Sequence, residues 1–267
     1  MHQEIELEPG VFGKRIEPFH DMIHPNNQMH QVLYISGTYE PNSLLVLKKF
    51  LKQNDVFLDV GANAGIYTLF ASRCVGEGGK IISFEPSSRE YALLEENVQL
   101  NALRNVVLEK RAVSDACGIK FLRLAIEKHN GQNTLCDNFA YEDAFSSLKE
   151  SVAVVSLDQY VKNNALKRIN FIKMDIEGAE LSALQGAKQI FHQYRPLLLM
   201  EICQSALKRN KISLRSIYHF FETYQYQTFS IDDQTAEIYF NDKFETWEEN
   251  IFVVPREKVQ ELGIISS

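Results

Sequence analysis

Short apolar runs separated by amphipathic segments organise the chain from residue 55 onward. Five runs have the length of buried strands, at residues 56–60, 80–84, 106–113, 170–174 and 196–202. Residues 88–101 lie between two of these runs and place apolar side chains at helical spacing, which predicts a helix. Strands that alternate with helices in this way indicate an α/β fold, a doubly wound and mostly parallel sheet with helices on both faces.

The remaining segments fit the same fold class. Further helices and strands are predicted at residues 181–190, 214–224, 238–240 and 251–254. Residues 119–124 are expected to pair with residues 152–155, as a hairpin-like excursion around a polar insertion at residues 127–151. We expect one main domain over residues 51–267, preceded by an N-terminal extension or cap over residues 1–50.

Composition and charge limit the kinds of partner. The chain has 267 residues, of which 45% are hydrophobic, and this is enough for one substantial core. The net charge of -7 argues against nucleic acid as a partner, since phosphate binding needs an excess of lysine and arginine. No apolar run approaches the roughly 18 residues of a membrane span, and the four cysteines form no CxxC pair. We therefore predict a soluble, cytoplasmic protein with no nucleic-acid and no membrane partner, and its oligomeric state stays open.

The most informative stretch is DVFLDVGANAGIYTLFAS, in which a strand ends in an acid and opens into a glycine-bearing turn. Gly61 and Gly65 allow the backbone to come close to a ligand at the carboxyl end of the strand. The spacing is neither that of a dinucleotide fingerprint nor that of a triphosphate loop. Asp59 before the turn suits a cationic or amine-bearing ligand instead. Plainer alternatives are helix-packing glycines, a turn role for Asn63 and an exposed helix position for Thr68.

Acidic side chains occur at the predicted carboxyl ends of four strands. They are Asp59, Glu85, Asp175 and Glu201. Ligands of open parallel sheets bind beside these ends, where the strand order reverses, so we expect the acids to lie along one rim. The carboxylate of Glu85 could accept hydrogen bonds from both hydroxyls of a ribose, and the alternative is an acid that merely faces water.

A second group of acids follows the strand at residues 170–174. Asp175, Glu177 and Glu180 could hold a substrate hydroxyl, act as a general base or gather a divalent cation. We favour Asp175 and Glu177 for substrate or base chemistry and assign no metal ligand. Glu180 could equally serve the first turn of the helix that follows, where acids are stabilised by the helix dipole.

One histidine is a further candidate for chemistry. His129 lies in the polar insertion beside Asn130 and Gly131, where it could reach a substrate as a base. An exposed turn histidine is the alternative.

Four motifs together resemble a known family. DVGANAGIYT, then FEP, AVSD and KMDIEGAE occur in this order and resemble the successive motifs of FkbM-type methyltransferases, in the class I superfamily that uses S-adenosyl-L-methionine (SAM). GTYEP, HNGQNT and NIFVVP are also similar to family features, so the resemblance covers roughly residues 39–255.

The resemblance implies a seven-stranded sheet with its last strand antiparallel, and SAM as cofactor. It implies that residues 59–65 hold the methionine portion, that Glu85 takes the ribose, and that Ser114 and Asp115 lie near the adenine. The full set of cofactor-binding candidates is Glu40, Asp59, Gly61, Asn63, Gly65, Thr68, Glu85, Ser114, Asp115 and Asp175.

The expected activity is SAM-dependent O-methylation of a hydroxyl on a small molecule or sugar, with Asp175, Glu177 and His129 as catalytic candidates. A divalent metal is possible but has no assigned ligands. Two alternatives stay open, an NAD-dependent oxidoreductase on a related sheet and a non-catalytic scaffold that has kept the fold. The missing third glycine disfavours the first, and the intact acids disfavour the second.

Overall fold

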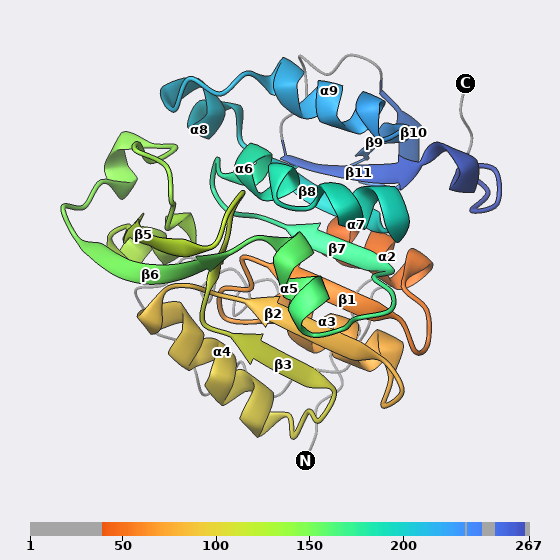
Figure 1. Cartoon of the computed structure of the whole chain (residues 1–267), viewed down its shortest axis with the longest axis horizontal. Coiled ribbons are helices and arrows are strands. Elements are labelled where there is room, and N and C mark those ends of the chain that lie inside the picture. The colour runs from red at the N-terminus through yellow and green to blue at the C-terminus, as the bar shows by residue number, and fades with distance from the viewer. Residues whose placement is uncertain (1–38, 233, 242–248, 265–267) are drawn as a thin grey trace.

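A computed structural model describes residues 39–232, 234–241 and 249–264 and contains a large central sheet (Figure 1). Its strands are β1 (Val56–Val60), β2 (Lys80–Phe84), β3 (Val106–Glu109), β7 (Phe171–Met174), β8 (Leu197–Ile202), β9 (Tyr226–Ile231), β10 (Ile238–Phe240) and β11 (Glu249–Pro255). Within the described residues their order across the sheet is β10-β9-β11-β8-β7-β1-β2-β3. The strand order reverses between β1 and β7, because the chain builds outward from β1 on one side and from β7 on the other.

Strand directions confirm the predicted mostly parallel sheet with its last strand antiparallel. The five strands from β3 to β8 run parallel, whereas β11 is antiparallel to both β8 and β9. The sheet has eight strands in the described residues rather than the expected seven. The strand predicted at residues 238–240 is β10, an antiparallel edge strand that pairs with β9. The eighth strand, β9, was not predicted from the sequence.

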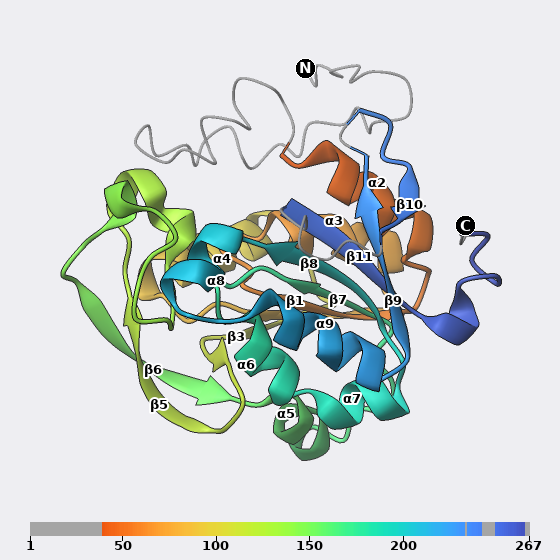
Figure 2. The same cartoon turned by 90° about the horizontal axis from the view of Figure 1, so that it is seen from above.

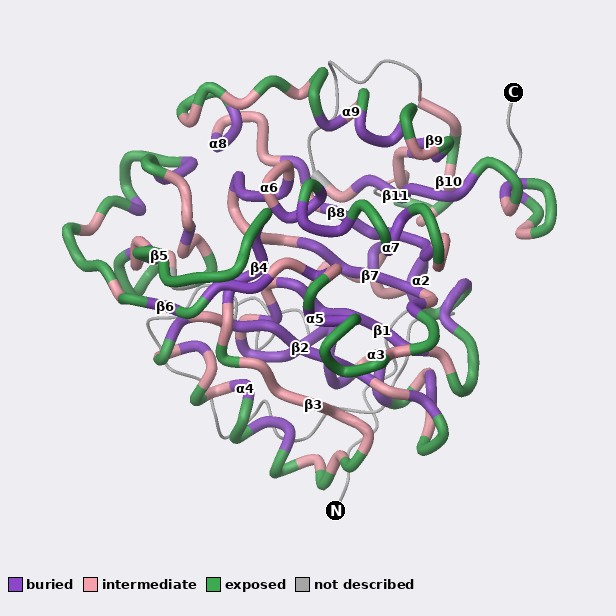
Figure 3. The backbone as a smooth tube through the Cα atoms, in the orientation of Figure 1, coloured by how far each residue is buried: buried purple, intermediate pink, exposed green. Residues whose placement is uncertain are grey.

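Helices cover both faces of the sheet, as the doubly wound fold requires (Figure 2). One face carries α2 (Pro41–Phe50), α3 (Ile66–Val75) and α4 (Ser88–Leu100). The other face carries α5 (Leu157–Asn163), α6 (Glu180–Gln185), α7 (Lys188–Gln193) and α9 (Leu214–Thr223). A short helix, α8 (Gln204–Arg209), follows β8. The inner strands between the two helical layers are almost entirely buried (Figure 3).

Packed aromatic rings join α2 to the sheet. Phe50 stacks on Phe252 of β11 with ring centroids 4.8 Å apart, and Phe252 stacks on Phe171 of β7 at 6.1 Å. Phe57 of β1 continues the row at 5.9 Å from Phe171. Helix α2 lies within the expected N-terminal extension, of which residues 1–38 fall outside the described residues. The boundary at residue 50 stays a prediction, but α2 shares the core of the sheet.

A smaller sheet projects from the carboxyl-end side of the main one. It contains β4 (Ala112–Val113), β5 (Gly118–Arg123) and β6 (Lys149–Val155) in the order β4-β6-β5. The antiparallel pairing of β5 with β6 confirms the predicted hairpin-like excursion. Its connection holds two short 3-10 turns, η2 (Glu127–Gln132) and η3 (Glu142–Ala144).

Two predicted elements are interrupted in the structure. The strand expected at residues 106–113 breaks after β3, where Arg111 N donates back to Glu109 O at 2.8 Å, and the chain then enters the smaller sheet as β4. The helix expected at residues 181–190 divides into α6 and α7 at Gly186. A Cβ atom at Gly186 would lie 2.1 Å from the carbonyl oxygen of Ser114, so only glycine allows the two segments to approach.

No helix in the described part of the chain is both long and apolar enough to cross a bilayer.

The Phe252→Ala variant tests the aromatic row. Removing a buried ring that touches Phe50 and Phe171 should lower the free energy of unfolding by about 3–5 kcal/mol. The measurement is urea unfolding followed by circular dichroism. Tyr239→Ala is the control, because this tyrosine on β10 is 51% exposed and should change stability little. Equal losses in the two variants would show that the row is not a main element of the core.

Candidate active site

A cavity of about 340 Å³ opens at the carboxyl ends of the parallel strands. Its walls come from the turn after β1, the strand ends of β2, β7 and β8, and the insertion between β5 and β6. The candidates that line it are Gly61, Asn63, Glu85, His129, Asp175 and Glu177. The cavity therefore lies where the strand order reverses, the position expected for a ligand site in this fold.

Glu85 ties the glycine turn to the end of β2. Its Oε2 accepts a hydrogen bond from Asn63 N, and its Oε1 accepts one from Ser87 N, both at 2.9 Å. Burial, followed by the charge of Glu90, raises the pKa of Glu85 to about 8 despite these two bonds. Each carboxylate oxygen can accept a second hydrogen bond, so Glu85 keeps capacity for a ligand hydroxyl.

The turn after β1 needs glycine for a steric reason. Gly61 has a φ of 86°, and a Cβ atom there would lie 1.9 Å from the carbonyl oxygen of Asp175. The turn therefore packs directly against the loop after β7 that carries Asp175 and Glu177, which we call the acid loop. Asn63 also has a positive φ, of 49°, and its Oδ1 accepts a hydrogen bond from Ala64 N at 2.7 Å. This is the turn role that the sequence allowed for Asn63.

Asp59, Thr68 and Gly65 lie behind the turn and do not line the cavity. The hydroxyl of Thr68 donates to Asp59 Oδ2 at 2.6 Å and also contacts the hydroxyl of Ser83 at 2.6 Å. Thr68 is buried, so its alternative as an exposed helix residue is wrong. A Cβ atom on Gly65 would meet Leu94 Cδ1 at 2.6 Å, which fits the packing alternative for this glycine. These three residues therefore pack and hydrogen-bond beneath the turn rather than in the cavity.

Ser114 and Asp115 also stand apart from the cavity wall, which is formed here by Ala112 and Val113. Lys120 Nζ donates to Ser114 Oγ at 2.6 Å, and Ser114 Oγ donates to Asp115 Oδ1 at 2.9 Å. The hydrogen bond from Ser114, with others from Lys120 and Ser182, lowers the pKa of Asp115 to about 2. The expected contact of Ser114 and Asp115 with an adenine stays a prediction.

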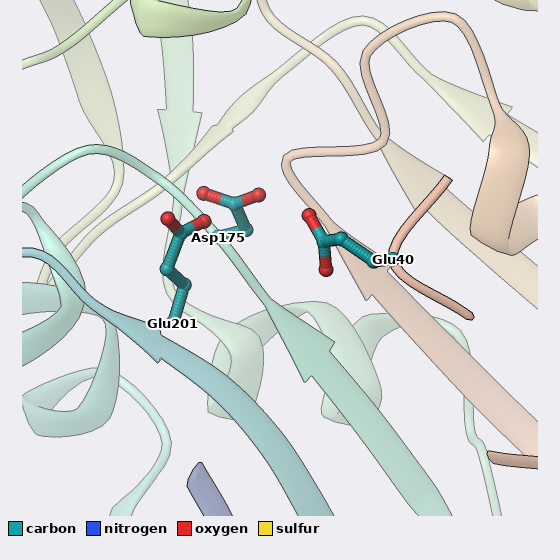
Figure 4. A group of neighbouring side chains, drawn as sticks. All are labelled: Glu40, Asp175 and Glu201. Carbon is teal, nitrogen blue, oxygen red and sulfur yellow. The ribbon is translucent and has the colours of Figure 1, made fainter. Parts of the chain in front are cut away.

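Three carboxylates converge beside the cavity, and two of them, those of Asp175 and Glu201, belong to residues that line it (Figure 4). One oxygen each of Glu40, Asp175 and Glu201 lies within 4.8 Å of the others, and we call these three residues the acid cluster. Glu40 is held in place because its Oε2 accepts from the hydroxyl of Tyr67 at 2.6 Å and from Asn250 Nδ2 at 2.7 Å. The charge of Asp175, with burial second, raises the pKa of Glu201 well above its ordinary value.

The two glutamates that follow Asp175 differ in their surroundings. Glu177 lines the cavity in a left-handed backbone conformation with a φ of 54°, and burial and then the charge of Asp175 raise its pKa well above the ordinary value. Glu180 Oε1 instead accepts from Gly178 N at 3.0 Å and from Ile176 N at 3.3 Å. Of the two alternatives for Glu180, the structure agrees with the helix-terminal one.

The insertion covers the cavity with polar side chains. His129 is only 12% exposed, and its Nε2 lies 3.3 Å from Asp143 Oδ2. Within the described residues, His129 Nδ1 and Gln132 Oε1 are buried without a hydrogen-bond partner. Both residues line the cavity, so these atoms are available to a ligand. The alternative of an exposed turn histidine is therefore wrong.

Hydrogen bonds fix the insertion to the main domain, and two of them lie close to the cavity wall. Thr134 Oγ1 donates to the carbonyl oxygen of Glu177 at 2.8 Å, and Asn133 Nδ2 donates to Glu90 Oε2 at 2.9 Å. Both donors belong to the HNGQNT motif.

The glycine turn and the loop after β7 also match a known family. Residues 59–228 match the methyltransferase FkbM domain family.

The chain belongs to the FkbM methyltransferase family. The match spans both the glycine turn and the acid loop, so the family features and the cavity occupy the same part of the chain.

Two curated relatives agree with membership of the FkbM family. Methyltransferase sdnD of Sordaria araneosa is 29% identical over 164 residues, which cover 52% of this chain and 62% of that protein. The 31-O-demethyl-FK506 methyltransferase FkbM of Streptomyces tacrolimicus is 27% identical over 161 residues, covering 52% of this chain and 61% of that protein. The alignments therefore span less than two thirds of the length of either relative.

A solved structure is also similar. Methyltransferase FkbM from Methylobacillus flagellatus KT has 14% sequence identity and a TM-score of 0.49, over 90% of this chain and 58% of that one.

Sequence reasoning missed several residues of the site. Glu201 was noted as a strand-end acid without a role, and Lys173 appeared only as a letter of the KMDIEGAE motif. Tyr67 and Asn250 hold Glu40 but come from α3 and β11, far from Glu40 in the sequence. An available signal was the period-two alternation of strands, which puts Asp59, Lys173 and Glu201 on one face of the sheet.

The Asp59→Asn variant tests the buried acid beneath the turn. Burial raises the pKa of Asp59 from 3.8 to about 6. The folded protein then holds this proton more tightly than the unfolded chain does, so this group's contribution to stability is present at low pH and is lost as pH rises from about 4 to about 6. Over this pH range the free energy of unfolding of the unmodified chain should fall by about 2–3 kcal/mol because of Asp59, and that of the variant should not show this fall.

Urea unfolding between pH 4.5 and pH 7 measures this difference. Asp137→Asn is the matched control, because the side chain of Asp137 is 97% exposed. If Asp59→Asn keeps the same pH dependence as the unmodified chain, Asp59 titrates normally and the assignment is wrong.

Proposed function

We propose that this chain transfers a methyl group from SAM to a hydroxyl of a small molecule or sugar. The observation that supports the proposal most is that the glycine turn, Glu85 and Asp175 meet at one cavity in a chain of the FkbM family. The NAD-dependent alternative lacks both a third glycine and family support.

The side chains present fit SAM. Glu85 is a buried acid at the end of the second strand and has unused acceptor capacity toward the two hydroxyls of a ribose. The turn at Gly61 and Asn63 would lie along the methionine portion. In the part of the wall that the insertion supplies, His129 Nδ1 and Gln132 Oε1 are buried without a hydrogen-bond partner among the described residues, and a polar ligand would provide one.

For methyl transfer, the protein has mainly to align the acceptor oxygen with the methyl group and to remove the proton of the acceptor hydroxyl. When bound, SAM supplies a methyl group on a positively charged sulfur, and the acceptor oxygen displaces the neutral thioether in line with the bond that breaks. Asp175 borders the cavity, and its backbone carbonyl packs against Gly61 of the glycine turn. Its carboxylate would take the proton from the acceptor hydroxyl.

The electrostatics of the cavity suit a cationic cofactor. Glu85, Asp175, Glu177 and Glu201 line it, and Glu40 lies beside Asp175 and Glu201. A cationic sulfonium would favour the ionised forms of these acids, whereas a phosphate would be repelled by them. This excess of acids favours SAM over phosphate-bearing dinucleotides.

An oxygen acceptor is supported by the name of one relative. That relative, FkbM of Streptomyces tacrolimicus, is described as a 31-O-demethyl-FK506 methyltransferase, an O-methylating activity on a small molecule. We propose the same class of reaction here, with the insertion at residues 127–151 setting which acceptor enters.

The Glu85→Gln variant tests the cofactor site. Exchanging the carboxyl group for an amide replaces one acceptor oxygen by a hydrogen-bond donor, so the Kd for SAM should rise about 10–100-fold. Isothermal titration calorimetry of the full chain with SAM is the measurement. Glu142→Gln is the control, because Glu142 is exposed on η3 and pairs with Arg209 away from the cavity wall. Absence of SAM binding by the unmodified chain would refute the proposed function.

The Asp175→Asn variant tests the base. It should leave the Kd for SAM within about threefold and slow methyl transfer at least about 100-fold. The assay incubates the protein with SAM and extracts of the source organism, and mass spectrometry follows acceptors that gain one methyl group. Asp137→Asn serves as the control for turnover. Full turnover by Asp175→Asn would exclude it as the base, and SAM binding without any product from the unmodified chain would favour the scaffold alternative.

A further inference from the structure

A lysine is buried directly beneath the acid cluster. Lys173 lies in β7 with a side chain that is 1% exposed, although an ammonium in a protein core is strongly destabilising unless it is paired. Its Nζ is 3.8 Å from Asp175 Oδ2 and donates to Asn250 Oδ1 at 3.0 Å. The ammonium also lies 5.0 Å from the centre of the Tyr67 ring, at cation–π distance.

The partners of Lys173 are also the partners of the acid cluster. Asn250 accepts from Lys173 through Oδ1 and donates through Nδ2 to Glu40. Tyr67 faces the ammonium with its ring and donates its hydroxyl to Glu40. One amide and one phenol thus bridge the buried cation to the carboxylate that is farthest from it along the chain.

Charged and titratable groups face Lys173 from every neighbouring element. They are Asp59 in β1, Asp175 and Glu177 after β7, Glu201 in β8, Glu40 before α2 and Tyr67 in α3. Burial by itself would lower the pKa of Lys173, but the charges of Asp175, Glu40, Glu201 and Asp59 outweigh burial and raise it. The lysine is therefore charged throughout the pH range in which the acids titrate.

We propose that Lys173 is a positioning residue whose ammonium is the built-in counter-cation of the acid cluster. Three carboxylates within 4.8 Å of one another repel strongly unless positive charge lies among them. A divalent metal ion is the other possible source of that charge. The buried ammonium makes it unnecessary, because the cation is already present and held by Asn250 and Tyr67.

The consequence for catalysis rests on the proposed function. An ammonium fixed 3.8 Å from Asp175 Oδ2 holds this carboxylate in place beside Glu201, on the cavity wall where the acceptor hydroxyl would lie. The test below measures the charge balance of the cluster without SAM or acceptor, so its failure is distinguishable from failure of methyl transfer.

The Lys173→Met variant removes the charge and keeps most of the side-chain length. The loss in the urea midpoint of unfolding should be at least about twofold larger at pH 8.0 than at pH 5.5, because carboxylates without a counter-cation can relieve their repulsion only by taking up protons. A lysine that served only for packing would give the same loss at both pH values. Lys167→Met, at an exposed lysine, is the control and should change neither midpoint.

A charge-balanced double variant completes the test. Lys173→Met combined with Glu201→Gln removes one positive and one negative charge, and should regain at least about half of the loss at pH 8.0. If Lys173→Met does not fold, the comparison of the double variant with Glu201→Gln alone decides. A double variant that fails to fold while Glu201→Gln folds would overturn the proposal, and so would a loss that does not depend on pH.

Titration of the unmodified chain with Mn²⁺, followed by electron paramagnetic resonance, addresses the metal alternative. We expect no Mn²⁺ binding that depends on Glu201. Micromolar Mn²⁺ binding that disappears in Glu201→Gln would show that a metal takes the place assigned to Lys173 and would overturn the proposal.

Discussion

The parallel order β2-β1-β7-β8 is the constraint on which the site depends. Because parallel neighbours end on the same side, the residues that follow these strands must meet along one rim. Glu85 after β2, Asp175 after β7 and Glu201 in β8 reach the same cavity for this reason. Gly61 closes the arrangement, since only a residue without a side chain lets the turn after β1 touch the Asp175 carbonyl. The chemistry is thus assembled from segments that are far apart in the sequence.

The alternation of side chains along the strands places the buried charged residues on one face of the sheet. Asp59 pairs in register with Lys173 across β1 and β7, and Asn250 pairs with Glu201 across β11 and β8. All four lie on the face that α2 and α3 cover, at the carboxyl end of the sheet, while aliphatic and aromatic side chains fill the rest of this face. The buried charges lie close enough to compensate one another, so one face of the sheet holds both a hydrophobic core and an ionic centre.

Local patterns explain what the sequence could predict. The glycine turn, Glu85 and Asp175 were identifiable because each directly follows a strand whose apolar run is visible in the sequence. The break after β3 and the division at Gly186 were not, because tertiary contacts cause them: in the second case the Ser114 carbonyl lies where a side chain would be. The bridging roles of Tyr67 and Asn250 were likewise hidden, since hydrogen bonding between α3, β11 and the segment before α2 leaves no periodic signal.

The cavity has two walls with different structural origins, and this difference bears on specificity. The strand-end wall is fixed by the sheet, whereas the opposite wall is an irregular insertion attached through Thr134 and Asn133. Irregular segments accept sequence change more readily than strands, because fewer backbone hydrogen bonds and core contacts depend on them. Yet Thr134 holds the carbonyl of Glu177, so the insertion also helps to set the shape of the acid loop. Acceptor choice and base geometry are therefore linked: a change in the insertion that admits a new acceptor must keep the Thr134 anchor to preserve the acid loop.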